Sequence, residues 1–168
     1  DIGSASTSAV DADENDQIWL TISGYTQPTT LALAEIGKEP ETLKSLPAYF
    51  DASDLTVEQH FATSADGTHI PYFVVRPKNL RTDGKSPTLH YGDGVFKVAH
   101  TPGYSGGIGK TWLTRKTASG RSGVYVVANC RGGGEYGPRW HQAALKQNRH
   151  KAYEDFAAVA RDLAARGI

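Results

Sequence analysis

The sequence has no methionine, a single cysteine and no net charge, and each of these absences narrows what the chain can be. Because position 1 is not Met, we expect the 168 residues to be processed or cut from something longer. Because Cys130 is the only cysteine, the chain cannot form an internal disulfide, and the redox state of its compartment stays undetermined. Cys130 lies in an apolar run, which predicts that it is a small residue of the core. Eighteen basic residues balance eighteen acidic ones, which argues against nucleic acid or an anionic membrane as the partner, because both attract a basic excess.

Long hydrophobic runs are also missing. No stretch of about 18 apolar residues occurs, so we expect no membrane-spanning helix, and the acidic, Ser- and Ala-rich residues 1–16 lack the features of a signal peptide. The six histidines and one cysteine form no cluster with metal-ligand spacing. The sequence therefore predicts a soluble protein, cytoplasmic or periplasmic, without a metal or a cofactor.

The first part of the chain predicts a small β unit. Residues 1–16 are polar and predict a disordered lead-in. Residues 18–23 (IWLTIS) and 30–36 (TLALAEI) are expected strands, joined by a turn that contains Pro28. Residues 37–52 are polar and contain proline, so they predict a linker.

The rest of the chain predicts strands alternating with helices. Residues 56–64 and 69–76 form an expected hairpin around Asp66-Gly67, a strong turn signal. Residues 88–91 and the apolar, β-branched run 123–130 are expected buried strands. A hairpin that leads into strand–helix units indicates the α/β class.

Three helices are expected, near residues 110–113, from Pro138 to Lys146, and over 151–165. The third shows the clearest pattern, with Glu154 and Asp155 largely off its apolar stripe. The stripe consists of residues at helical spacing: Tyr153, Phe156, Ala157, Ala160, Leu163 and Ala164.

Two glycine-rich segments match nucleotide-binding patterns incompletely. Residues 132–137 (GGGEYG) fit G-x-G-x-x-G, but the acidic residue required about 20 positions on falls inside a predicted helix. Pro138 also removes an N–H that a phosphate would use. In residues 103–111 the first glycine is one residue too far from Gly-Lys-Thr for a phosphate-binding loop. Neither segment favours a nucleotide.

A third segment, residues 103–107 (GYSGG), is a formal G-x-S-x-G. In hydrolases this pattern holds a strained, exposed nucleophilic serine between a strand and a helix. Here His100-Thr101-Pro102 is a poor strand end, so a flexible loop serine is the alternative for Ser105.

Residues 91–96 (YGDGVF), 101–106 (TPGYSG) and 128–141 (ANCRGGGEYGPRWH) resemble the prolyl oligopeptidase family of serine hydrolases. The similarity is densest over residues 125–168 and extends more weakly back to about residue 11.

This resemblance implies a partial α/β-hydrolase sheet, preceded by a short β remnant like the last strands of a propeller. The domains implied are residues 1–46, with the lead-in, propeller-like strands and linker, and residues 47–168, the N-terminal half of an α/β-hydrolase-like domain. It also implies that the family's catalytic Ser, Asp and His lie beyond residue 168, so none of them can be assigned here.

Two other positions of the family do fall on this chain. The second Tyr of the family's Tyr-Gly-Tyr-Gly-Gly-Phe motif donates its hydroxyl to an oxyanion, and Asp93 stands at that position. An ionised carboxylate would repel an oxyanion instead. Phe96 matches an aromatic residue of the substrate pocket, with a role in the core as the alternative.

The sequence leaves three functions open. The first is a serine hydrolase that cuts a small ester or peptide, acting as a small esterase if the chain is active in this form. Ser105 would be the nucleophile, and His100 or His141 the base that takes its proton. Asp93 would orient that base.

The second function is a catalytically inactive remnant of the family, and the third is an assembly module that docks on a partner. A half-sheet also predicts an open edge at residues 123–130, through which copies of the chain could associate into a homo-oligomer.

Overall fold

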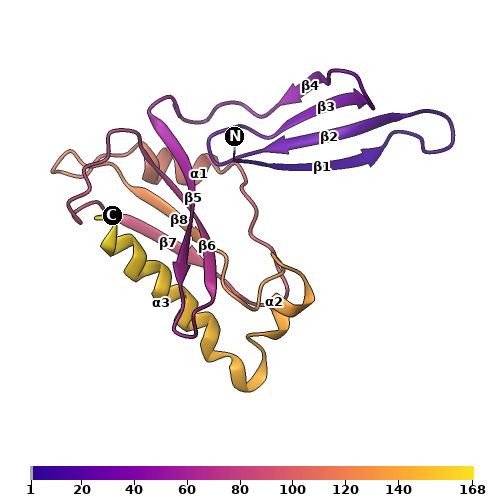
Figure 1. The fold of residues 1–168 in the computed structure, drawn as a ribbon. Helices are drawn as coiled ribbons and strands as arrows, with labels where there is room; N and C mark the ends of the chain where they lie inside the picture. The colour runs from indigo at the N-terminus through magenta and orange to yellow at the C-terminus, as the bar shows by residue number, and fades with distance from the viewer. Residues whose placement is uncertain (1) are drawn as a thin grey trace.

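Short runs of apolar and β-branched residues near the start of the chain pair in sequence order. The computed structural model describes residues 2–168. In it, β1 (Ser4–Ala9), β2 (Gln17–Ser23), β3 (Thr30–Glu35) and β4 (Glu41–Ser45) form an antiparallel sheet in the order β1-β2-β3-β4. This first sheet projects to one side of the molecule, as Figure 1 shows.

Two of these strands lie where the sequence predicts no regular structure. β1 falls within the predicted lead-in, residues 1–16, and β4 within the predicted linker, residues 37–52. Both strands are almost wholly exposed, so cross-strand backbone hydrogen bonds rather than burial of apolar side chains hold them. The predictions of a disordered lead-in and an unstructured linker are therefore wrong for these two strands, because pairing of this kind leaves little trace in composition.

The second sheet is mixed and carries the rest of the fold. β5 (Leu55–Thr63) and β6 (His69–Pro77) form the predicted hairpin, in whose turn Gly67 takes a φ of +84°. β7 (Thr88–Gly92) and β8 (Val124–Ala128) are parallel to each other, and the order across the sheet is β5-β6-β8-β7.

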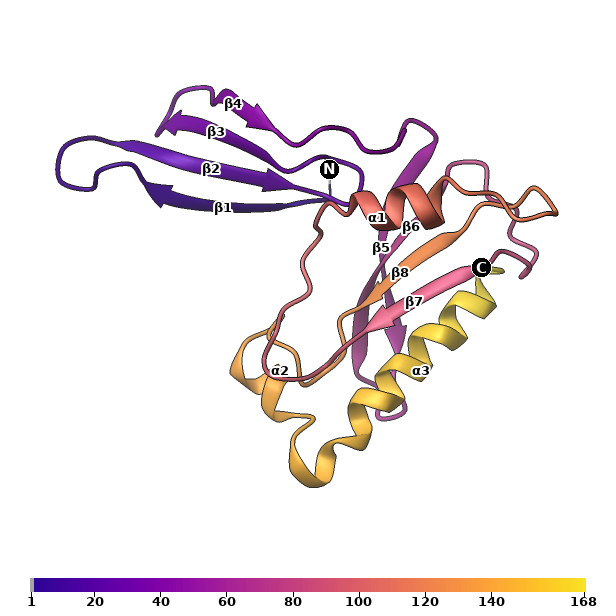
Figure 2. The ribbon, with the colours of Figure 1, turned by 180° about the vertical axis from the view of Figure 1, so that it is seen from behind.

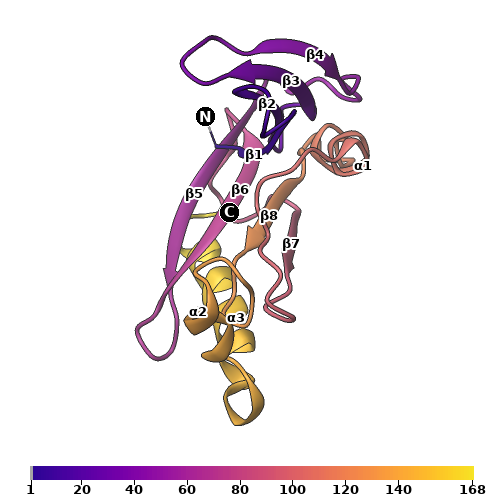
Figure 3. The same cartoon turned by 90° about the vertical axis from the view of Figure 1, so that its right-hand side faces the viewer.

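The edge strands of the second sheet are β5 and β7, as Figures 2 and 3 show, and not the strand at residues 123–130. β8 lies between β6 and β7, and Val124, Val126 and Ala128 are fully buried in it. The crossover after β7 returns β8 to the inside of the sheet, and a β-branched run buried on both faces suits that place. Self-association through a sheet edge therefore concerns β5 or β7 and stays a prediction.

Helices cover the second sheet. α1 (Gly106–Ile108) continues into the π-helical turn η1 (Gly109–Leu113), and α3 (His150–Ala165) is the long C-terminal helix, both close to prediction. α2 (Pro138–Gln142) begins at the predicted proline but ends before Lys146, where the 3₁₀ turn η2 (Lys146–Asn148) begins. Lys146 has a φ of +51°, and a left-handed residue cannot continue an α-helix. None of the helices within residues 2–168 is long and apolar enough to cross a membrane.

α3 buries a different stripe from the predicted one. Tyr153 is 65% exposed, and Ala160 and Ala164 also face solvent. The helix is therefore rotated so that a charged residue faces inward. Its buried residues are Ala152, Asp155, Ala158, Val159 and Leu163.

Two apolar clusters connect the layers. One lies between the second sheet and α3 and includes Tyr72, Val126 and Val159. The other joins the two sheets, with the ring of Tyr25 centred 5.7 Å from that of Phe73. Cys130 is buried in the first cluster, as the sequence predicts.

A buried ion pair ties α3 to the end of β8. Asp155 is 0% exposed and Arg131 3%. The Arg131 guanidinium donates to Asp155 Oδ1 at 2.7 Å, and its backbone N–H donates to Oδ2 at 2.9 Å. Ser64 Oγ donates to the same carboxylate at 2.6 Å.

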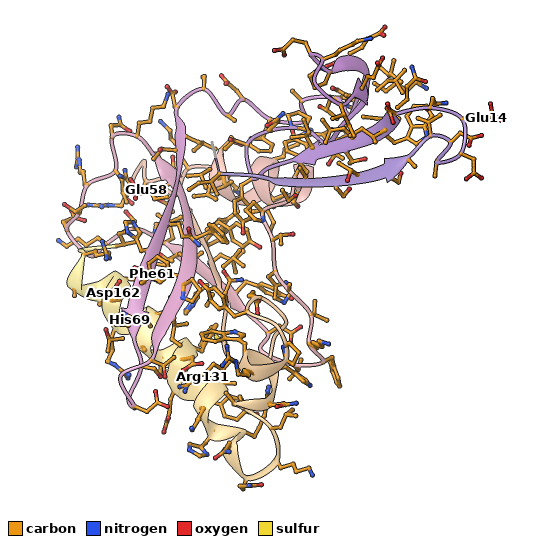
Figure 4. All side chains as sticks on the ribbon, turned by 45° about the vertical axis from the view of Figure 1, so that its right-hand side comes forward. Glu14, Glu58, Phe61, His69, Arg131 and Asp162 are labelled. Carbon is orange, nitrogen blue, oxygen red and sulfur yellow. The ribbon has the colours of Figure 1, made fainter. Side chains whose placement is uncertain are left out.

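Arg131, which is labelled in Figure 4, also reaches the turn of the β5–β6 hairpin. There its guanidinium donates to Asp66 Oδ2 at 2.6 Å. This hydrogen bond is the main reason that the pKa of Asp66 lies well below its ordinary range. One guanidinium thus joins the helix, the hairpin and the loop after β8.

The edge strand carries a partly buried histidine. The ring of His90 stacks on Phe156 of α3, with centroids 3.8 Å apart, and its Nε2 is buried without a hydrogen-bond partner. Burial lowers the pKa of His90 from 6.5 to about 4, because the charged form loses its hydration.

Substituting Asp155→Ala should lower the free energy of unfolding by about 3–5 kcal/mol, since it leaves the buried Arg131 guanidinium with only the partly exposed Asp66 as a carboxylate partner. Urea unfolding with an unchanged m-value measures this loss. The control is Glu154→Ala on the same helix, which should change stability by less than about 0.5 kcal/mol. Equal effects of the two variants would contradict the structural role of the ion pair.

The unfolding free energy should depend on pH through His90. Because its folded pKa is lower than its unfolded pKa, the neutral ring's contribution is complete above pH 6.5 and is lost as the pH falls through about 4. Between pH 7 and 4 the free energy of unfolding of the wild type should therefore fall by about 1 kcal/mol more than that of His90→Phe, which keeps the stacking on Phe156. This value is reduced because His90 is partly exposed to solvent. The exposed His69→Phe serves as control and should follow the wild type; identical pH profiles of all three proteins would exclude this role for His90.

Candidate functional site

The loops after the two parallel strands lie at one end of the second sheet. β7 and β8 run in the same direction, so their carboxyl ends meet there. Ligands of open α/β sheets bind outside the carboxyl ends of the strands. The loop after β7 carries Asp93, Phe96 and His100, and the chain after β8 leads to His141, so this end of the sheet is the candidate site.

Close contact between glycines fixes the path of these loops. Gly94 has a φ of +62° and Gly132 a φ of +100°, and a Cβ on Gly132 would lie only 1.9 Å from the Gly94 carbonyl oxygen. Lys97 N–H donates to Gly132 O at 3.2 Å, and Gly134 N–H donates to Val98 O at 3.0 Å. Side chains at the two glycines would push the loops apart.

The predicted acid and one predicted base lie side by side. His100 Nε2 is 3.5 Å from Asp93 Oδ2, and both side chains are mostly buried. The backbone of His100 is also held: its N–H donates to Glu135 Oε1 at 3.2 Å, and its carbonyl oxygen accepts from Asn129 Nδ2 at 2.9 Å. A carboxylate next to an imidazole can hold that ring in one orientation and stabilise its protonated form.

Asn129 and Glu135 are functional neighbours that the sequence analysis does not identify. Asn129 is a 3% exposed polar residue that directly follows the buried strand β8. Its Nδ2 also donates to Glu135 Oε1 at 3.1 Å. A polar side chain at the carboxyl end of a buried strand is the signal that could have indicated its place at the site.

Ser105 is engaged elsewhere. Its Oγ accepts from Ile108 N–H at 3.2 Å and caps α1. Among residues 2–168 it makes no hydrogen bond to a histidine. His141 Nδ1 lies 2.6 Å from Gly132 O, so that ring nitrogen donates to the carbonyl. The catalytic roles assigned from the sequence to the serine, the acid and the two bases stay predictions.

Phe96 lies at a surface cavity. Its side chain is 86% exposed, so the alternative of a core role is wrong. The cavity has a volume of about 530 Å³, and its lining is Val95, Phe96, His141, Ala144, Leu145, Lys146 and Arg149.

Strained backbone gathers around this cavity. Within residues 2–168, the non-glycine residues with positive φ are Phe96 at 54°, Lys97 at 59° and Lys146 at 51°. Two of them line the cavity, and Lys97 follows directly in the chain. Each such conformation costs about 1–2 kcal/mol, and strain of this kind concentrates at functional sites. Neither Phe nor Lys indicates a left-handed residue in a sequence.

Two sheets, one antiparallel and one mixed with a helix against it, define a mixed α/β protein whose candidate site lies at the ends of parallel strands. Residues 109–168 match the family model described as the prolyl oligopeptidase family. The chain therefore resembles this family over those residues, as its sequence motifs predict.

Relatives match almost the whole chain. The chain is 45% identical over 157 residues to an uncharacterized peptidase of Sinorhizobium fredii, covering 93% of this chain and 21% of the relative. It is 34% identical over 152 residues to a prolyl endopeptidase of Elizabethkingia miricola, covering 90% and 21%. A solved post-proline cleaving enzyme from Rickettsia typhi has a TM-score of 0.83 at 36% identity, covering 98% of this chain and 23% of that one. The chain thus spans about a fifth of the length of the curated relatives it matches.

Phe96→Gly should raise the free energy of unfolding by about 0.5 kcal/mol, because relief of the left-handed strain exceeds the added entropy of glycine in the unfolded chain. Urea unfolding measures the change. Val98→Gly in the same loop, exposed but not left-handed, is the control and should lose about 0.5–1 kcal/mol. A destabilised Phe96→Gly protein would show that the aromatic ring supports the fold and not a site.

Proposed function

We propose that the chain acts in peptide hydrolysis, as the part of a prolyl oligopeptidase-type serine peptidase that forms the substrate-facing loops after β7 and β8. The observation that carries this proposal is the match of 98% of the chain to a post-proline cleaving enzyme at 36% identity. An exposed Phe96 beside a cavity supports it, since an aromatic ring presented to solvent can hold an apolar peptide side chain.

The proposed division of the chain follows the two sheets. Residues 1–46 would be a propeller-like β unit, because a four-stranded antiparallel sheet in sequence order is the form of a propeller blade. Residues 47–168 would be the N-terminal half of an α/β-hydrolase-like domain. The packing of Tyr25 against Phe73 and Tyr125 supports joint action of the two parts.

Asp93 and His100 would supply proton transfer at the site. An ionised Asp93 cannot donate a hydrogen bond to an oxyanion. Because it lies 3.5 Å from His100 Nε2, it would instead orient the imidazole, which can accept a proton and return it to a leaving group.

A second candidate is ester hydrolysis by the chain itself, favoured by the same Asp93–His100 contact five residues before Ser105. Ser105 Oγ would leave Ile108 N–H and pass its proton to His100 as it attacks the ester carbonyl. The alcohol would depart from the tetrahedral intermediate, and water would then release the acid. Activated esters suit this mechanism because their leaving groups need little protonation.

The proposed peptide site predicts that acetyl-Ala-Pro-amide shifts the backbone NMR resonances of the loops after β7 and β8, including those of Phe96 and His100. Removing the aromatic surface by Phe96→Ala should weaken binding about tenfold, the effect of losing about 1.4 kcal/mol of apolar contact. Phe61→Ala, which removes an exposed ring on β5 outside the cavity lining, is the matched control and should bind normally.

Absence of these shifts, or shifts confined to the first sheet, would contradict the peptide site. Labelling by a fluorophosphonate and hydrolysis of p-nitrophenyl acetate then test whether the chain itself carries out catalysis. Neither labelling nor turnover above a denatured control is expected if the chain supplies only the substrate-facing part. Label on Ser105, lost in Ser105→Ala but retained in Ser119→Ala, would establish the small esterase instead.

A further inference from the structure

The cavity beside Phe96 combines two kinds of lining. Val95, Phe96, Ala144 and Leu145 form an apolar wall, and His141, Lys146 and Arg149 bring basic groups to it. No acidic side chain lines it within the part of the chain that the structure describes. Lys and Arg are charged at neutral pH, so the lining suits a ligand that is both apolar and anionic.

Arg149 is held in place before any ligand arrives. One of its guanidinium N–H groups donates to the Gly94 carbonyl, and the guanidinium carbon lies 5.3 Å from the centroid of the Tyr153 ring. A guanidinium has five N–H donors, so others stay available. A fixed guanidinium fits the two oxygens of a carboxylate, because it can donate two parallel hydrogen bonds.

The strain at the cavity has no visible compensation within the fold. Phe96 and Lys146 are left-handed, and both side chains are exposed, so burial does not offset the cost. The loop contact between Gly94 and Gly132 determines the path near Phe96 and leaves its ring in solvent. Strain that holds an exposed aromatic ring and a lysine at one cavity points to a ligand that contacts both.

We propose that this cavity binds the C-terminal carboxylate of a peptide whose last residue is apolar. Phe96, Val95 and Leu145 contact the apolar side chain, and Arg149 and Lys146 bind the carboxylate. This inference rests on the proposed function, since it names the end of the peptide that the site recognises.

The test compares acetyl-Ala-Pro with a free carboxylate and acetyl-Ala-Pro-amide, by isothermal titration of the full chain. The two probes differ only at the terminal group. The free acid should bind about tenfold more tightly, because charge-assisted hydrogen bonds contribute more than neutral ones.

Two matched lysine variants locate the carboxylate. Lys146→Asn removes the charge while keeping a residue that tolerates left-handed backbone, and it should abolish most of the preference for the acid without changing binding of the amide. Lys97→Asn makes the same change at a left-handed lysine outside the cavity lining and should keep the preference within about twofold.

Each outcome decides a separate point. Equal affinities of acid and amide would overturn the carboxylate site and leave the peptide site standing. Equal losses in the two lysine variants would overturn it as well, by showing general charge attraction. If neither probe binds, both the carboxylate site and the proposed peptide site are wrong.

Discussion

The fold depends on the pairing of Arg131 with Asp155. Two charges removed from water must satisfy each other, and leaving one unpaired costs several kcal/mol. The contact therefore fixes the rotation of α3 about its axis, since only one face presents Asp155 to β8. The same guanidinium reaches Asp66 and so fixes the end of the hairpin. Residues 132–137 directly follow Arg131, whose backbone and side chain are both hydrogen-bonded to Asp155, so the start of the loop after β8 is fixed.

From that anchor the candidate site is built by close backbone contact. Gly132 approaches Gly94 at a distance that no side chain would permit, and the loop after β7 follows. This arrangement places Asp93 beside His100 and turns Phe96 outward. The similarity to the prolyl oligopeptidase family is the reason that we propose a substrate-facing surface at the carboxyl ends of the parallel strands. An ionised carboxylate accepts hydrogen bonds and does not donate them, so the proposed role of Asp93 is to orient His100 and not to bind an oxyanion.

The site could be predicted only in part. The motif around Asp93 and Phe96 identifies the loop after β7, and the structure brings Asp93 to His100, 7 residues along the chain. The cap formed by Ser105 follows from the start of α1, a short helix whose position the sequence indicates only roughly. Lys146 and Arg149 line the cavity because α2 ends at Gln142, before the predicted end of that helix. No pattern in the sequence around these two residues predicts a left-handed residue or a ligand-binding role.

The sequence by itself determined the elements whose signals are local. Asp66-Gly67 specifies the hairpin turn, the run 123–130 specifies a buried strand, and Pro138 marks the start of a helix, because turn geometry, burial and proline's fixed φ act within a few residues. Only the tertiary structure decided that β1 pairs with β2 and β4 with β3, that β7 lies at an edge of its sheet and that α3 turns Asp155 inward. The exposed strands β1 and β4 pair with nearby segments through backbone hydrogen bonds, which amino-acid composition does not record. The positions of β7 and Asp155 depend instead on partners far along the chain, and neither segment alone specifies such a contact.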